Sequence, residues 1–260
     1  MRWLLLPCLA CVGCFGSSNE DLSPIAVALV AGSSIGHSAS MTAAAMHAPV
    51  ACVTVTQPCS ASFPCDGVAA VTLGDACPLP LGGVGSGQVA VSGSWAATDM
   101  ATLGMSFGVG VSDGNVSLSE AIGIKVSGAT TGHQTVAYVG QDVSVTSGTT
   151  LAGQSSWTVD VDDKGTPGDP SDDGYTIDGA QQGAGAGSGA NVKQVTLTSV
   201  VLDPSCRKNP VSGMGLIQAV GSSTLEEVEI SFHAACDGKV DVRGTLGGTH
   251  SQKLVLFTHK

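Results

Sequence analysis

The densest group of side chains that could do chemistry in this 260-residue chain is acidic. Hard cations such as Ca²⁺ take about six to eight oxygen ligands, and closely spaced aspartates on a loop bent by glycine can supply them. The 160–178 segment therefore has two interpretations, a weak calcium site and a solvated acidic loop that holds no cation. Six aspartates fall within 14 residues of it, namely Asp160, Asp162, Asp163, Asp169, Asp172 and Asp173.

A second candidate is a serine that could act as a nucleophile. Residues 32–36, GSSIG, fit the pattern GxSxG, which places a reactive serine on a sharp turn between a strand and a helix. His133 and His233 follow downstream as possible bases. However, the surrounding sequence lacks the alternating helices and parallel strands of that architecture. We expect no catalytic residue, and we keep as the alternative function a secreted hydrolase that uses Ser34 or carboxylates of residues 160–173.

The nine cysteines form a third group of reactive side chains. Three lie within the first 14 residues, and the other six are Cys52, Cys59, Cys65, Cys77, Cys206 and Cys236. These six lack the CxxC pairs of zinc sites, whereas an even number of cysteines in an exported chain indicates disulfides. We expect two bridges among the first four of them, in any of three connectivities, and one bridge between Cys206 and Cys236.

The start of the chain has the form of an export signal. Arg2 is the only charged residue before Glu20, and it precedes an apolar run of about 11 residues. That run is too short to span a membrane, which takes about 20 apolar residues. Residues 11–14, CVGC, resemble the lipobox of bacterial lipoproteins, in which a small residue precedes a cysteine that carries diacylglycerol and becomes the new N-terminus.

The resemblance implies a signal peptide over residues 1–13, a lipidated Cys14, and a tether over residues 14–24 that holds the protein at the membrane. Modification of Cys14 leaves six cysteines, whereas modification of Cys11 would leave seven and hence one unpaired thiol. The even number favours Cys14. Ordinary secretion without a lipid also leaves six, so a secreted protein remains the alternative location to the bacterial cell envelope, at the outer membrane or the cell surface.

Composition limits the partners and the type of core. The net charge is −11, and an acidic surface repels phosphate backbones, so we expect no nucleic-acid partner. Charged residues make up only 12% of the chain and aromatic residues 4%, whereas 43% of the residues are hydrophobic. The chain can therefore bury a core, built mainly from Val, Ala, Leu and Ile.

Alternation with period two indicates that strands position these side chains. Apolar residues alternate with polar or small ones over 105–111, 228–236 and 240–242, and shorter runs do so at 89–91, 122–126 and 195–197. Asp113-Gly114-Asn115 and Asp237-Gly238 read as hairpin turns. Short strands and tight turns predict one all-β domain over residues 25–260, an antiparallel β-sandwich or closed barrel with about a dozen or more strands stapled by disulfides.

Three segments are less clear. The apolar run 25–31 reads as a strand, and the Ala-rich stretch 38–48 fits either a short helix or, as we favour from its neighbours, a strand. Residues 181–190, which include QQGAGAGSG, read as a flexible loop because Gly and Ala offer little to pack.

Together these features predict an exported, lipid-anchored envelope protein that works as a non-catalytic binding or structural module. Its predicted partners are the membrane, through the N-terminal lipid, and a protein or glycan whose identity the sequence leaves open. No resident cofactor is expected apart from the calcium considered above.

Overall fold

The computed structural model describes a defined set of residues, and the expectations for residues 1–21, 38–48 and 113–115 lie outside it. The described residues are 22, 24–26, 28, 29, 32, 33, 36, 52–56, 64–78, 84–97, 100–112, 117, 118, 124–129, 133–146, 149–166, 169, 171–187, 190–220, 227–246 and 249–257. No helix in this part of the chain is long and apolar enough to span a bilayer.

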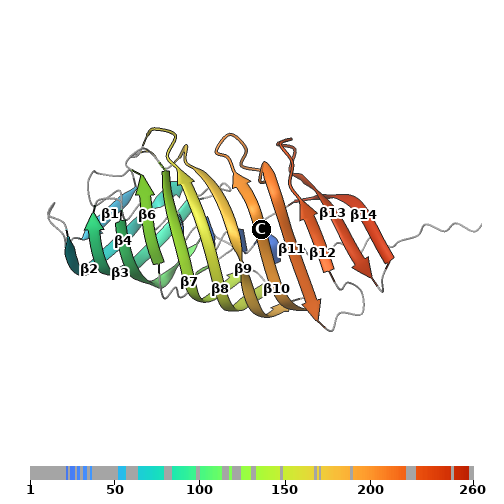
Figure 1. Cartoon of the computed structure of the whole chain (residues 1–260), viewed down its shortest axis with the longest axis horizontal. Coiled ribbons are helices and arrows are strands. Elements are labelled where there is room, and N and C mark those ends of the chain that lie inside the picture. Colours follow the sequence, from blue (N-terminus) through green and yellow to red (C-terminus); the bar gives the residue numbers. More distant parts are fainter. Residues whose placement is uncertain are drawn as a thin grey trace, which may run out of the picture.

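Fourteen strands in the described residues form one antiparallel sheet (Figure 1). The sheet is a meander, because the other strands pair with their neighbours in sequence, whereas β5 and β6 both lie between β4 and β7 and pair with those two strands. The strands are β1 Val53–Thr56, β2 Cys65–Pro78, β3 Val84–Ala97, β4 Met100–Ser112, β5 Ser117–Leu118, β6 Ile124–Ala129, β7 His133–Thr146, β8 Thr149–Asp162, β9 Gly174–Gly187, β10 Ala190–Leu202, β11 Ser212–Val220, β12 Glu227–Ser231, β13 Lys239–Leu246 and β14 Thr249–Leu256.

The expectation of a mainly antiparallel β protein is confirmed, but a closed barrel is not seen. β1 and β14 lie at the two ends of the strand order, and no pairing joins them among the described residues. The described strands also belong to a single hydrogen-bonded sheet rather than to two. Connections that are short in sequence explain this topology, because a strand can reach an antiparallel neighbour through a short connection, whereas a parallel neighbour needs a crossover of a dozen or more residues.

The core lies on one face of the sheet, which we call the inner face. In β8, Trp157, Val159 and Val161 are buried, whereas Thr158 and Asp160 between them are exposed. Successive side chains on a strand point to opposite sides, so this alternation defines the two faces. The same alternation buries residues expected in the core of β10, β12 and β13, namely Val195, Leu197, Val228, Ile230, Val240 and Val242.

The prediction of a strand over 25–31 is wrong, because the described residues between 24 and 36 are helical. The carbonyl oxygen of Leu22 accepts hydrogen bonds from the backbone N–H groups of Ile25 and Ala26, both at 3.1 Å. Pro24 occupies the first turn, where its missing N–H costs nothing. Leu22 and Pro24 are both buried, so the packed body already includes the end of the segment expected to be a tether.

This helical segment packs closely on the inner face of the sheet because glycines stand at the points of contact, both in the helical segment and in the sheet. A Cβ added to Gly36 would lie 2.5 Å from Val159 Cγ1 in β8, and one added to Gly215 in β11 would lie 2.7 Å from Ile25 Cδ1. The segment therefore crosses the strands between β11 and β8, and its blue ribbon is visible behind the sheet in this region (Figure 1). The helix covers the core where we expected a second sheet or a barrel wall.

β10 contains a bulge near Ser199. Ser199 has a φ of 48°, and the register of β10 shifts here against both β9 and β11. The Asp178 carboxylate in β9 accepts a hydrogen bond from the Ser199 backbone N–H at 2.7 Å. Glycines stand on both sides of the bulge, Gly179 with a φ of 140° and Gly213 with a φ of 101°. A bulge of this kind increases the local twist and lets the sheet curve.

Three expectations about connections are corrected. Residues 181–187 belong to β9 and pair with β8, so they are not a flexible loop. The strand expected over 228–236 ends at Ser231, so β12 and β13 are joined by residues 232–238 rather than by a two-residue turn at Asp237-Gly238. The acidic segment is also divided, because Asp160 and Asp162 belong to β8, whereas 174–178 begin β9.

Candidate functional site

Three connections lie along one edge of the sheet, the upper edge in Figure 1. They are residues 163–173 between β8 and β9, 203–211 between β10 and β11, and 232–238 between β12 and β13. A meander places every second connection at the same edge, so these loops are neighbours although the chain between them is long. We call their described residues the loop rim.

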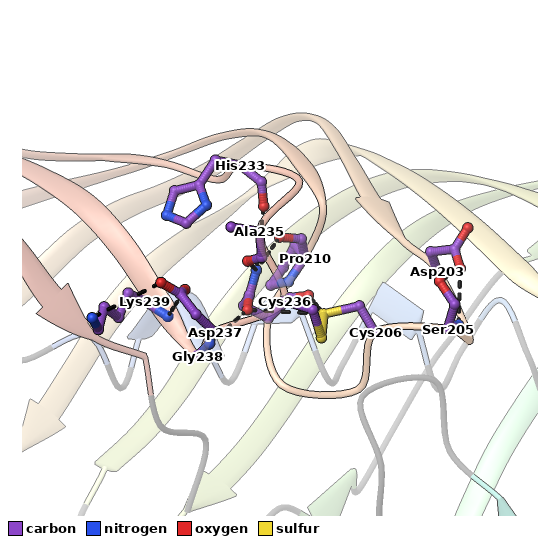
Figure 2. Close-up of a disulfide and its surroundings, with 11 residues drawn as sticks. Asp203, Ser205, Cys206, Pro210, His233, Ala235, Cys236, Asp237, Gly238 and Lys239 are labelled. Atoms are coloured by element: carbon purple, nitrogen blue, oxygen red, sulfur yellow. Dashed lines mark hydrogen bonds and ion pairs between the residues drawn. A yellow bond between two sulfur atoms is a disulfide. The ribbon is translucent and has the colours of Figure 1, made fainter.

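A disulfide joins the second and third loops of the rim, as predicted (Figure 2). Cys206 and Cys236 are bonded with their Cα atoms 5.5 Å apart, within the normal range for a disulfide. Cys206 is buried, and the other half of the bridge is exposed. The bond closes a loop over a sequence separation of 30 residues and therefore restricts the unfolded chain.

Asn209 lies fully buried beside this disulfide, and it ties the same two loops together. Its amide nitrogen donates a hydrogen bond to the carbonyl oxygen of Pro210 at 2.8 Å within the same loop, and across to the third loop to those of His233 and Ala235 at 3.4 and 3.3 Å. Its amide oxygen accepts a bond from the backbone N–H of Gly238 at 2.9 Å. One side chain thus satisfies main-chain groups that have no partner in a strand.

The first loop joins the rim through Arg207, whose guanidinium donates a hydrogen bond to the carbonyl oxygen of Ser171 at 3.3 Å. At the end of β8 that leads into this loop, the Asp162 carboxylate lies 2.8 Å from the Lys164 ammonium, and this hydrogen bond lowers the pKa of Asp162 and raises that of Lys164. Both groups are exposed at the surface, so the pair contributes little to stability.

The predicted cation ligands mostly accept hydrogen bonds from the protein itself. Asp163 accepts from the Gly165 backbone N–H at 2.8 Å, and Asp172 accepts from the Thr166 hydroxyl at 2.6 Å. Asp160 lies away from the loop on the outer face of β8, where Thr135 donates to it at 2.6 Å. No group of three His, Cys, Asp or Glu side chains that could hold a metal ion is found among the described residues. Calcium binding here stays a hypothesis.

Asp173 differs from its neighbours because it is buried, with 8% of its surface exposed. Burial raises the pKa of its carboxyl to about 7, and the nearby carboxylates of Asp172, Asp163 and Asp169 add to the rise. The phenol of Tyr175 donates a hydrogen bond to Asp173 at 3.3 Å, which opposes the rise but does not cancel it. The base of the acidic loop therefore holds a carboxyl group that is partly protonated near neutral pH.

We expect Asp173→Asn to become progressively more stable than the natural protein as the pH rises from 4 to 8. The unfolded carboxyl has a pKa near 3.8, so between about pH 4 and pH 7 the folded protein binds more protons and its free energy of unfolding falls with rising pH. The amide of the variant does not titrate, so the variant keeps this free energy of unfolding. At pH 8 the difference between the two proteins should be on the order of 2 kcal/mol after allowance for solvent screening. Urea unfolding at several pH values measures the difference.

Asp169→Asn is the matched control, because the exposed Asp169 carboxylate accepts hydrogen bonds from Ser171 that lower its pKa. This stabilising effect is present above the pKa that the Asp169 carboxyl has in the unfolded chain, and it is lost as the pH falls. Asp169→Asn should therefore be less stable than the natural protein at neutral pH but not at low pH. Parallel stability curves for Asp173→Asn and the natural protein would contradict the assignment of the raised pKa.

The first group of cysteines lies at the far end of the sheet. Cys52 forms a disulfide, and its carbonyl oxygen accepts a hydrogen bond from Gly74 in β2. Cys65 and Cys77 lie near opposite ends of this one strand, too far apart for a bond between them. The register places Cys52 near the Cys77 end of β2, and Cys59 lies outside the described residues.

The GxSxG pattern does not stand on a strand-to-helix turn. Its described members, Gly32, Ser33 and Gly36, are buried within the helical segment, and Ser34 lies outside the described residues. Gly32 packs against Ile177, where an added Cβ would lie 3.1 Å from the Cγ2 atom. Close packing on the sheet therefore explains the glycines of the pattern without a catalytic role.

Sequence reasoning missed two residues that organise this edge, Asn209 and Asp178. Nothing in the sequence marks Asn209, whereas the Asp178-Gly179 pair carries the usual signal of a turn although it lies within β9. Comparison of the chain with protein-family models, curated proteins and solved structures finds no match.

Proposed function

We propose that the protein is exported, lipid-anchored at the bacterial cell envelope, and active there as a non-catalytic binding or structural module. The observation that carries the proposal is the loop rim, in which a disulfide, Asn209 and Arg207 link three loops. Loops fixed on a rigid sheet are the usual means by which β proteins hold a binding surface in place. The partner is a protein or a glycan, for which this acidic edge with its exposed Arg207 and Lys208 offers hydrogen-bonding groups.

The first 14 residues support the envelope location, since they resemble a lipobox-type signal. The contacts of the helical segment with β8, β9 and β11 support a single domain over residues 25–260. The proposal does not require calcium, because the loop's own N–H and O–H groups already bond carboxylates of the loop.

We expect Cys14→Ser to move the protein from the membrane fraction to the soluble fraction, because a hydroxyl cannot form the thioether that attaches the lipid. Intact-mass spectrometry of the natural protein should give a chain that begins at Cys14 with an added diacylglyceryl group. Cys11→Ser is the control, and it should stay with the membrane. A Cys14→Ser protein still in the membrane fraction, or a natural protein that keeps residues 1–13, would refute the lipid anchor.

A further inference from the structure

Three polar side chains are buried on the inner face without any hydrogen-bond partner in the described part of the chain. Ser155 and Trp157 belong to β8 and Gln181 belongs to β9, and their exposed fractions are 3%, 1% and 3%. The unpaired atoms are the Ser155 hydroxyl, the Trp157 indole nitrogen, and both the nitrogen and the oxygen of the Gln181 amide. Exchanging the two amide atoms of Gln181 cannot repair this, since neither has a partner.

The sheet register places these three side chains close together, with glycines at neighbouring positions of the same face. Ser155 lies directly opposite Gln181 in the β8–β9 pair. Gly153 lies opposite Gly183 at the next inner-face position, and Gly179 lies opposite Trp157 on the other side. Residues two apart on a strand share a face, so the unpaired side chains are flanked by inner-face positions that carry no side chain.

The chemistry of the groups restricts what can bind there. Each buried polar group left unpaired costs about a tenfold shift toward the unfolded state, so four such atoms within one region require a partner. The indole nitrogen only donates, and the Gln181 oxygen only accepts, so the partner must both accept and donate hydrogen bonds. The described inner-face neighbours Ile177 and Val195 are apolar, which disfavours an ion.

We propose that Ser155, Gln181 and Trp157 form an internal site for a neutral hydroxyl- or amide-bearing molecule. The shared chemistry is that of a small uncharged hydrogen-bonding group, which either an internal water or a small neutral organic molecule provides. The site lies on the inner face of β8 and β9, separate from the loop rim, and it does not depend on the envelope function.

The test compares Gln181→Met with Gln182→Met in the mature full chain. Gln182 is the next residue of β9 and is exposed on the opposite face, so it controls for the change in composition and strand propensity. Methionine has nearly the shape of glutamine but forms no strong hydrogen bond. If the site is occupied, Gln181→Met should raise the unfolding equilibrium constant about tenfold or more, and Gln182→Met less than about threefold.

An unoccupied site gives the opposite sign, because Gln181→Met would then remove two unpaired polar atoms and make the protein more stable. Equal effects of the two variants would likewise overturn the proposal. Ser155→Ala removes a single oxygen and serves if Gln181→Met does not fold. It should destabilise the protein if the site is occupied and leave it unchanged or stabilise it if not.

A crystal structure of the mature chain identifies the occupant. Density bonded to both the Gln181 amide and the Ser155 hydroxyl is the expected result, and bonds to them from another part of the chain would overturn the proposal. Native mass spectrometry then separates the two sources. An organic occupant adds a discrete mass that disappears on denaturation and is absent from Gln181→Met, whereas density in the crystal together with the unchanged mass of the chain identifies water.

Discussion

Gly179→Ala is expected to destabilise the protein by about 3–5 kcal/mol, because the backbone of the paired strand β8 leaves no room for a side chain at this position. The added Cβ would lie 2.1 Å from the carbonyl oxygen of Ser156 and 2.9 Å from the Cα atom of Trp157. Both obstacles belong to the backbone of the paired strand, so no rotamer change relieves them. The φ of 140° adds strain that only glycine avoids. Denaturant unfolding measures the loss.

The matched control is Gly165→Ala, which also requires a positive φ, of 82°, but has no atom within 4 Å of the added Cβ. It isolates the cost of backbone conformation, roughly 1 kcal/mol. The difference between the two variants is the cost of the clash. Equal destabilisation by both would mean that β8 and β9 can move apart at Gly179, and would contradict the tight pairing there.

Alternation predicted the strands of the C-terminal half because one face of this sheet is buried and the other is wet. Val228 and Ile230 are buried as expected, whereas Glu227 and Glu229 between them are partly exposed. The same signal could not reveal the helix over 24–36, because Ile25, Ala26, Ala28 and Leu29 are all buried. A run that is apolar at nearly every position fits a buried strand and a buried helix equally well.

The strand at 181–187 was missed for a different reason. Gly183, Gly185 and Gly187 offer no side chain to a core, and we therefore expected a loop. Strand pairing, however, uses backbone N–H and C=O groups, which glycine supplies like any other residue. β8 and β10 lie on either side of β9 and determine its conformation. Its side chains did not have to specify it.

Sequence reasoning located the Cys206–Cys236 bridge and the acidic loop of the candidate site, but not how the loops are held together. Cysteine parity and carboxylate density are local signals that can be read without a fold. Asn209 acts on His233 and Gly238, which lie more than twenty residues away. No spacing rule connects these positions, and only the meander brings the second and third loops together.

Asn209→Leu is the second change with a large expected effect, a loss of about 4 kcal/mol in the free energy of unfolding. Leucine has the same branching of heavy atoms but forms no hydrogen bonds. It leaves the buried N–H of Gly238 and the partly buried carbonyl oxygens of His233 and Ala235 without their partner. Each such group costs about 1–3 kcal/mol. Lys208→Met, at the exposed neighbouring position, should change stability by less than about 0.5 kcal/mol.

The disulfide and Asn209 hold the same two loops, so their contributions should not add. Replacing Cys206 and Cys236 by alanine removes the bond that closes a loop of about 30 residues. The free energy of unfolding should fall by about 3–4 kcal/mol. Once the loops can separate, water reaches the groups that Asn209 had bonded, and Asn209→Leu should then cost about 1–2 kcal/mol less than it does with the disulfide intact. A double-mutant cycle by urea unfolding measures this coupling. Strict additivity would show that the second and third loops keep their positions independently, and the loop rim would then be three separate loops rather than one surface.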